Sequence, residues 1–149
     1  MWHLPTQQHI DFAEYNIAAV IPAYNEAAHI TEVIRTVPEF ITHIFVVDDA
    51  STDHTAEVVE QAALEDPRVK LLRHKENRGV GGAMITGFRH ALDVEAQIGV
   101  KLDGDGQMSP EHLEDLLYPL VLGTADYTKG NRFHDFEALS KMPLLRRLG

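Results

Sequence analysis

Two carboxylates one residue apart, Asp103 and Asp105, are the residues of this chain best placed to do chemistry. They follow the apolar run 98–102, and a glycine after each aspartate lets the backbone turn tightly there. With Gln107 nearby, the pair offers the hard oxygen ligands that suit Mg²⁺ or Mn²⁺. Because these ions usually complete their shell with water and ligand phosphates, the pattern predicts a phosphorylated substrate. Asp-Gly is also a common turn dipeptide, so an ordinary acidic turn remains the alternative.

Length, charge and cysteine content narrow the classes of protein to consider. A chain of 149 residues with 44% hydrophobic residues can bury one core. The formal net charge of -10 argues against nucleic acid as a partner. The absence of cysteine excludes disulfides and thiolate chemistry, and the nine histidines lack the helical spacing of a zinc site. With no apolar run of about 20 residues and no signal-peptide pattern, we expect a cytoplasmic protein.

Short apolar runs alternate with segments of helical period, which is typical of an α/β fold. The predicted strands are 17–21, 44–47, 69–72, 98–102 and 125–129. The predicted helices are 27–37, 51–64 with Ser51 or Thr52 as N-cap, 79–92, and 110–122 after Ser109 as N-cap. Since the strands are continuously apolar, they indicate a parallel sheet buried on both faces, with helices on each side.

Polar residues follow three of these strands at the point where each one ends. The segment 22–26 follows the first strand, Asp48 and Asp49 follow the second, and Asp103 with Asp105 follows the fourth. Ligands of open α/β sheets bind beyond the carboxyl ends of the strands, so we expect these residues to meet at one edge. Taken singly, each has a structural explanation as a loop, a helix-terminal acid or a turn.

Four ordered motifs carry a resemblance to glycosyltransferase family 2. They are Val20-Ile21-Pro22-Ala23-Tyr24-Asn25-Glu26, Val46-Val47-Asp48-Asp49-Ala50-Ser51-Thr52-Asp53, Asn77-Arg78-Gly79-Val80-Gly81-Gly82-Ala83 and Leu102-Asp103-Gly104-Asp105-Gly106-Gln107. The resemblance covers about residues 17–133 and implies a GT-A fold, a Rossmann-like, mostly parallel sheet. The Asp-Gly-Asp-Gly-Gln form and the segment 129–132 look most like the polyprenyl-phosphate mannosyl- and glucosyltransferases within this family.

The resemblance also implies roles for individual residues around a nucleotide-sugar donor. Pro22, Ala23, Tyr24 and Glu26 would line the pocket for the base and ribose of a UDP- or GDP-sugar. Asp49 would accept a hydrogen bond from an N–H of the base, which is reasonable carboxylate chemistry.

The same resemblance implies a metal-dependent, inverting transfer to an acceptor, a polyprenyl phosphate or a glycan. Asp103 and Asp105, the DXD pair, would hold Mg²⁺ or Mn²⁺ with Gln107 against the donor diphosphate. Arg132 would grip a phosphate bidentately. Asp103, Asp105 and Arg132 are thus the predicted catalytic residues, and solvated charge at the end of a strand is the alternative for Arg132.

The glycines in segment 79–87 do not form a dinucleotide-binding motif. Met84 stands where the spaced triplet needs its third glycine, and the segment follows the third strand rather than the first. These glycines indicate close contact between a helix and the sheet.

Members of the family normally continue well beyond the point where this sequence ends, so we expect a chain truncated at its C-terminus. The expected organisation is an N-terminal extension (1–16), a nucleotide-sugar-binding core (17–133) and the start of an acceptor-side segment (134–149). The basic and apolar segment 141–148 could begin an interfacial helix, which would place the protein at the cytoplasmic face of a membrane.

Two other classes fit part of the pattern. A phosphoacceptor receiver domain also has an acidic pair, a later aspartate and a lysine at strand ends, which Asp48, Asp49, Asp103 and Lys129 imitate. Its acidic pair would follow the first strand rather than the second, and Asp105 would have no role in it. A catalytically silent nucleotide-sugar-binding module is the other alternative, and only turnover assays separate it from an enzyme.

Overall fold

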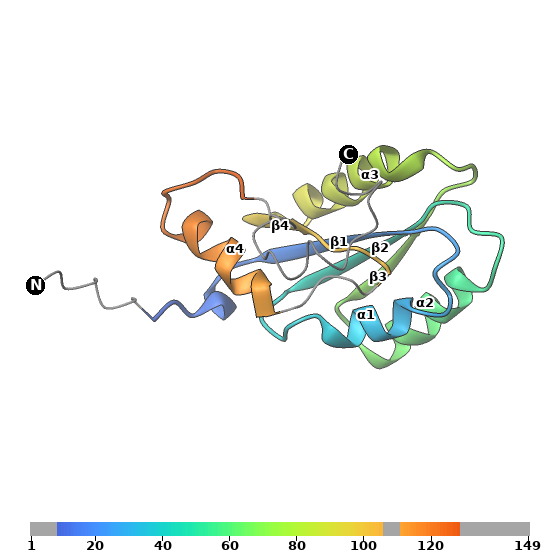
Figure 1. Ribbon diagram of the computed structural model, residues 1–149, viewed down its shortest axis with the longest axis horizontal. Helices are drawn as coiled ribbons and strands as arrows, with labels where there is room; N and C mark the ends of the chain where they lie inside the picture. The colour runs from blue at the N-terminus through green and yellow to red at the C-terminus, as the bar shows by residue number, and fades with distance from the viewer. Residues whose placement is uncertain (1–8, 106–110, 129–149) are drawn as a thin grey trace, which may run out of the picture. The chain divides into compact units, whose positions relative to one another are not determined.

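A computed structural model of the chain describes residues 9–105 and 111–128 (Figure 1). The elements in chain order are a 3-10 helix η1 (Phe12–Glu14), β1 (Ile17–Ala23), α1 (Ile30–Thr36), β2 (His43–Asp48), α2 (Thr55–Glu65), β3 (Val69–Arg73), α3 (Gly79–Asp93), β4 (Ile98–Lys101) and α4 (Glu111–Val121). They fall into two compact units, residues 1–110 and 111–149, and the sheet belongs to the first.

The four strands of the sheet are all parallel and follow the order β3-β2-β1-β4. This confirms the predicted α/β class and parallel sheet. β1 and β2 are buried along almost their whole length, as their apolar sequences predict. β3 and β4 instead include several exposed and half-buried residues, because they lie at the edges of the described sheet.

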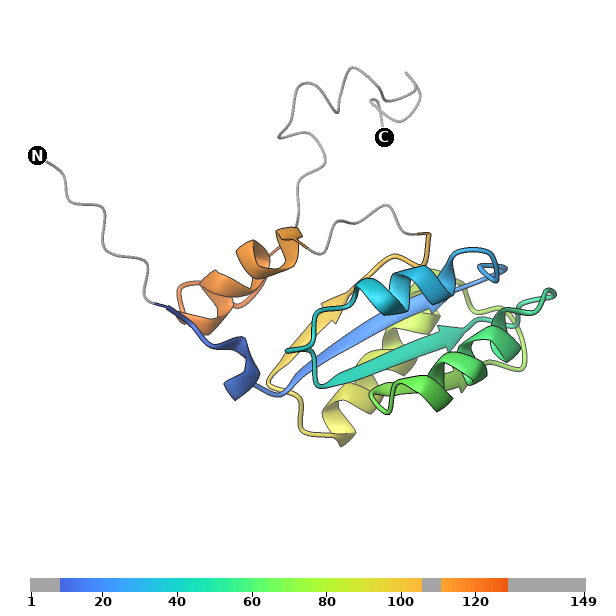
Figure 2. The ribbon, with the colours of Figure 1, turned by 90° about the horizontal axis from the view of Figure 1, so that it is seen from below.

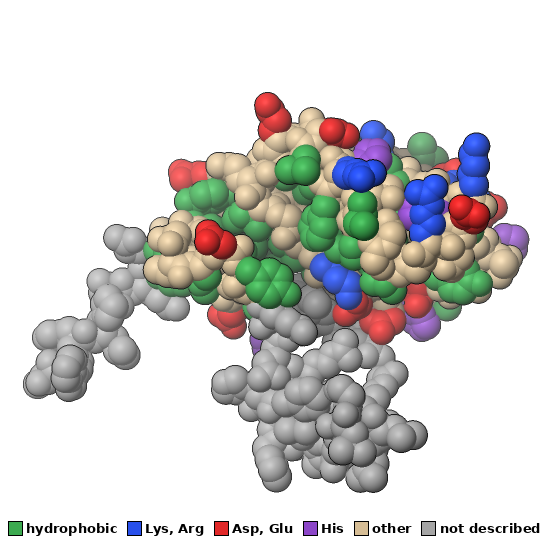
Figure 3. Space-filling view, turned by 90° about the horizontal axis from the view of Figure 1, so that it is seen from above, with side chains coloured by type: hydrophobic (Ala, Val, Ile, Leu, Met, Phe, Trp, Pro, Cys, Tyr) green, Lys and Arg blue, Asp and Glu red, His purple; other side chains and the backbone are tan. Residues whose placement is uncertain are grey.

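Helices cover both faces of this sheet. α3 lies on one face, and α1 with α2 lies on the other (Figure 1), where Figure 2 shows them from below. Under α3 the core is formed by Ala18, Val20, Phe45, Val47, Leu72, Ala83 and Ala91. Away from the sheet, α3 leaves Ile85, Phe88 and Leu92 exposed, and Figure 3 shows hydrophobic side chains on the face that carries this helix.

The predicted contact between glycines and the sheet is confirmed at one glycine in the middle of α3. A Cβ added at Gly87 would lie 2.1 Å from Val20 Cγ1, so only glycine permits this approach. At Gly81, near the start of the helix, an added Cβ would meet nothing within 4 Å. The expectation that the first glycines of the helix make this contact is therefore wrong for Gly81.

β1 was predicted to end at Ile21, before Pro22, but it continues to Ala23. Val20 accepts a hydrogen bond from the N–H of Leu102 at 3.0 Å, and β4 has its last paired residue, Lys101, opposite Val20. Pro22 is the next residue on that edge of β1. Its missing N–H therefore faces a position that β4 no longer occupies, and proline is tolerated there.

α1 and α2 both begin about three residues later than predicted. Residues 27–29 form turns, and Glu26 O accepts the N–H groups of both His29 and Ile30. Ser51 and Thr52 are not the N-cap of α2, because they bond to Asn25 in the loop after β1. α2 begins only at Thr55.

The predicted fifth strand is wrong where it can be examined, since residues 125–128 form no strand. Pro119 O accepts hydrogen bonds from the N–H groups of Thr124 and Ala125, which turn the chain after α4. Thr128 then bonds through its hydroxyl to Leu116 O at 2.8 Å, back on α4. Lys129 and the predicted helix start at Ser109 and Pro110 lie outside the described residues. None of the helices in the described ranges has the length and hydropathy needed to cross a bilayer.

Candidate functional site

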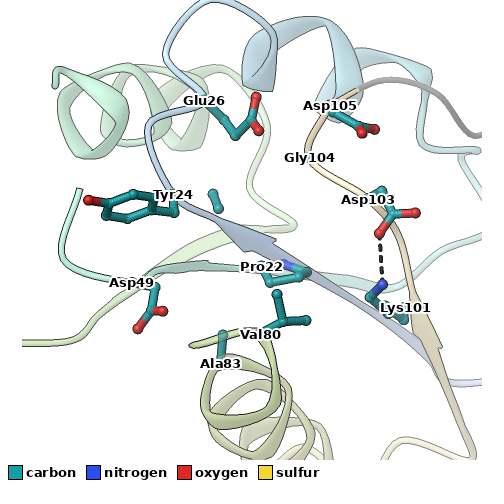
Figure 4. A pocket seen from close by; sticks show the side chains of 11 residues that line it. Pro22, Tyr24, Glu26, Asp49, Val80, Ala83, Lys101, Asp103, Gly104 and Asp105 are labelled. Carbon is teal, nitrogen blue, oxygen red and sulfur yellow. Dashed lines mark hydrogen bonds and ion pairs between the residues drawn. The ribbon is translucent and has the colours of Figure 1, made fainter. Parts of the chain in front are cut away.

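A pocket of about 210 Å³ lies where β1, β2 and β4 end (Figure 4). Its lining comes from the three strand ends and from the first turns of α3. The residues are Pro22, Ala23, Tyr24, Glu26, Asp49, Val80, Ala83, Lys101, Asp103, Gly104 and Asp105. Every candidate site residue that the structure describes therefore lines this one pocket. Gln107 and Arg132 lie outside the described residues.

The loops after β1 and β2 are bound to each other beside the pocket. Asn25 has a positive φ of 53°, and its Oδ1 accepts hydrogen bonds from the N–H groups of Thr52 at 2.8 Å and Asp53 at 3.3 Å. In return Ser51 Oγ accepts the N–H of Asn25 at 3.0 Å, and Thr55 Oγ1 accepts that of Glu26 at 2.9 Å. These reciprocal bonds fix how Tyr24 and Glu26 are presented relative to Asp49.

Asp53 has a structural role. It stands two residues before α2, which begins at Thr55, and so it is not an acidic residue of the first turn of that helix. Its carboxylate accepts hydrogen bonds from the N–H and hydroxyl of Thr55 and from the N–H of Ala27. The hydroxyl of Thr55 is the main cause that lowers the pKa of Asp53.

Asp49 is buried and is held at the start of α3. Its Oδ1 accepts a hydrogen bond from Nδ1 of His74 at 2.7 Å and another from the N–H of Arg78, the residue before α3, at 2.8 Å. Burial raises the pKa of Asp49, but the bonds from Arg78 and His74, with the N–H of Gly79 nearby, together outweigh it and leave that pKa below its ordinary value. Asp49 is therefore an anion at the α3 N-terminus, where the helix dipole favours it.

Only one member of the acidic pair lines the pocket. Asp48 is fully buried, and its Oδ1 accepts the N–H of Ser51 at 3.1 Å. Arg73 Nε lies 3.4 Å from Asp48 Oδ2, close enough for an ion pair but not aligned as a hydrogen bond. Asp48 therefore shapes the loop after β2, whereas Asp49 faces the ligand space.

The Asp103 to Asp105 turn is pressed against the end of β1. A Cβ added at Gly104 would lie 3.1 Å from the carbonyl oxygen of Pro22, so a larger residue would push the turn away from the pocket. Asp103 accepts an ion-paired hydrogen bond from Lys101 Nζ at 2.7 Å. In Figure 4 the carboxylates of Glu26 and Asp105 lie on the same side of the pocket.

The carboxylates of Asp103 and Asp105 fit a divalent ion that takes its remaining ligands from water and a substrate. In residues 9–105 and 111–128, no three His, Asp or Glu side chains are grouped to cage a metal by themselves. Mg²⁺ and Mn²⁺ commonly take one or two carboxylates and complete their shell with water and phosphate oxygens. Asp103 and Asp105, which line the pocket on either side of Gly104, match that pattern.

Sequence reasoning missed two charged or polar side chains of the site. The sequence assigns no role to His74, and nothing in it links His74 to Asp49, which lies 25 residues away. Lys101 stands two residues before Asp103, a spacing that brings side chains of extended backbone to the same side, and that spacing could have identified the pair.

Comparison with known proteins shows the family of this chain. The family described as glycosyl transferase family 2 matches residues 18–148. A UDP-N-acetylglucosamine–dolichyl-phosphate N-acetylglucosaminyltransferase of Methanococcus voltae is 31% identical over 92% of this chain and 60% of its own length. An undecaprenyl-phosphate mannosyltransferase of Micrococcus luteus is 38% identical over 78% of this chain and 48% of its own. The chain thus spans roughly half to three-fifths of these relatives.

Solved structures agree on the fold. The mannosyltransferase PcManGT from Pyrobaculum calidifontis, in complex with GDP-Man and Mn²⁺, has a TM-score of 0.61 and 28% identity over 71% of this chain and 33% of that one. Glucosyl-3-phosphoglycerate synthase from Mycobacterium tuberculosis, at 23% identity, shares the fold with a TM-score of 0.61, over 82% of this chain and 46% of that one. The predicted GT-A fold is confirmed, and the chain belongs to glycosyl transferase family 2.

Proposed function

We propose that this chain forms the donor-binding part of an inverting glycosyltransferase that moves a sugar from a UDP- or GDP-sugar to a polyprenyl phosphate. The observation that carries the proposal is the shared pocket. It brings Tyr24 and Asp49, suited to a base, together with Asp103 and Asp105, suited to a metal-bound diphosphate. The complex of PcManGT with GDP-Man and Mn²⁺ supports the same pairing of ligands.

The base and ribose would occupy the side of the pocket formed by β1 and β2. Tyr24 is 48% exposed, and its ring offers an aromatic surface for a base. Pro22, Ala23 and Glu26 would line the ribose side. Asp49 is held ionised by its hydrogen bonds, so its carboxylate can only accept a hydrogen bond, and we assign it to a base N–H.

The diphosphate would lie near the end of β4. Asp103 and Asp105, with Gln107, would hold Mg²⁺ or Mn²⁺ there, and the ion would stabilise negative charge on the departing nucleoside diphosphate. Lys101 pairs with Asp103 and so offsets the negative charge of that carboxylate at the same place. Arg132 would contact a phosphate of the donor or acceptor.

In the proposed reaction a phosphate oxygen of the acceptor attacks the anomeric carbon from the face opposite the leaving group. The bond from that carbon to the diphosphate breaks, so the anomeric configuration inverts. A phosphate acceptor is already ionised, and this step therefore needs no general base.

The names of several relatives support a lipid-phosphate acceptor. They include enzymes acting on dolichyl and undecaprenyl phosphate. Contact of segment 141–148 with the cytoplasmic face of a membrane is part of this proposal. Family membership argues against the receiver interpretation, as does the position of Asp48 away from the pocket lining.

An assay of sugar transfer distinguishes the proposed enzyme from a catalytically silent binding module. The protein is incubated with a UDP- or GDP-sugar, Mn²⁺ and a polyprenyl phosphate, and the product is identified by mass spectrometry and its anomeric configuration by NMR. The proposal expects an inverted glycosyl phosphate. Donor binding without formation of this product would indicate the binding module instead.

A further inference from the structure

We propose that His74 is a positioning residue that fixes the Asp49 carboxylate for recognition of the donor base. This inference rests on the proposed function, because it deepens the role of Asp49 in the same pocket. It adds a residue that lies behind the pocket and is not part of its lining.

His74 is held from three sides. It follows β3, and its own N–H donates to Asp48 O at 2.9 Å. Its side chain is only 5% exposed, with Nδ1 2.7 Å from Asp49 Oδ1 and Nε2 2.7 Å from Thr86 Oγ1 on α3. A buried ring with both nitrogens satisfied has little freedom to rotate.

The charge of Asp49 decides the direction of its bond to His74. An ionised carboxylate has no hydrogen to give, so Nδ1 of His74 must donate to Asp49. At the other side of the ring, Nε2 bonds to the hydroxyl of Thr86, a group that can either donate or accept. Thr86, His74 and Asp49 thus form a chain of hydrogen bonds that runs from α3 to the pocket.

The carboxylate of Asp49 is locked through one oxygen. His74 and the N–H of Arg78 both donate to Oδ1, so turning the carboxylate would break two hydrogen bonds. Neither bond uses Oδ2, which we assign to the base. A fixed acceptor of this kind favours a base that presents an N–H, as uracil does at N3 and guanine does at N1.

The test compares three replacements that differ in which ring nitrogen they imitate. His74→Asn places its amide nitrogen near the position of Nδ1, whereas His74→Gln reaches the position of Nε2. His74→Ala removes both. Each variant is titrated by calorimetry with UDP, GDP and inorganic pyrophosphate, all with Mn²⁺, and its thermal unfolding is recorded.

We expect His74→Ala and His74→Gln to weaken binding of the preferred nucleoside diphosphate about tenfold, as loss of a hydrogen bond to a charged group would. His74→Asn should recover to within about threefold of the wild type, since a donor to Asp49 is restored. Pyrophosphate affinity should stay within about twofold in all three, because the metal side of the pocket is untouched.

Equal nucleotide affinity in wild type and His74→Ala would overturn the inference and leave the proposed function intact. So would a loss of pyrophosphate affinity parallel to that of the nucleotide, or equal affinities of folded His74→Asn and His74→Gln. Failure of the wild-type protein to bind either nucleotide would instead overturn the proposed function, and this inference with it.

Discussion

Asn25 caps the loop after β2 across the sheet edge, with its Oδ1 accepting the N–H of Thr52 at 2.8 Å and the hydroxyl of Thr52 at 3.2 Å. Asn25 itself has a positive φ of 53°, which asparagine tolerates better than most residues do. The relation explains why this asparagine stands between two residues that line the pocket. It holds the β1 and β2 loops in one arrangement.

Replacing Asn25 should therefore loosen both loops. Asn25→Ala removes the acceptor and leaves a positive φ, so the free energy of unfolding should fall by about 1–3 kcal/mol. Asn25→Asp keeps an acceptor oxygen and should lower the stability less. Asn25→Gly removes the strain of the positive φ but does not restore the acceptor. Urea unfolding measures the three, and an alanine variant as stable as the wild type would show that this bond does not hold the loops.

Asp105→Ala should remove metal-dependent binding at the pocket. We expect the affinity for UDP or GDP with Mn²⁺ to fall at least about tenfold, because the ion loses one of its carboxylates. Asp115→Ala, an exposed acidic residue on α4, is the matched control and should bind as the wild type does. If Asp105→Ala kept metal-dependent transfer at the wild-type rate, its assignment as a ligand would be wrong.

Gly87 and Gly81 offer a matched test of the close approach of α3 to the sheet. Gly87→Ala would force a Cβ against Val20, at 2.1 Å from Cγ1, and should cost about 1–3 kcal/mol of stability. Gly81→Ala meets nothing within 4 Å and should instead stabilise the helix by about 0.5–1 kcal/mol. Equal effects at the two positions would contradict the packing described for α3.

The ion pair of Asp66 and Arg68 predicts a pH dependence far from the pocket. The side-chain hydrogen bonds of Arg68 lower the pKa of Asp66. Burial raises that pKa, but by less, so it stays below its ordinary value. A lowered folded-state pKa gives stability that is present above the unfolded value of about 3.9 and is lost as pH falls through the folded one. The stability difference between wild type and Asp66→Asn, about 1 kcal/mol at neutral pH, should shrink below about pH 4. A difference that is constant from pH 7 to pH 3 would rule out this linkage.

The sequence predicts those features that depend on local pattern. Apolar runs and helical periods identify β1 to β4 and α1 to α3, and the rule for strand ends predicts that Asp49, Asp103 and Asp105 meet. The α2 start was misplaced because Ser51 and Thr52, good capping residues by type, bond to Asn25 instead. His74 was missed because its partners are distant in sequence and its burial depends on tertiary packing.

Isothermal titration of the protein with UDP and GDP, with and without Mn²⁺, tests the central claim most directly. The account predicts that one of the two binds, that omitting Mn²⁺ weakens binding at least about tenfold, and that Asp49→Asn and Asp105→Ala each weaken it similarly. Absence of binding by both nucleotides in the presence of Mn²⁺, or binding that is unchanged in both variants, would contradict it.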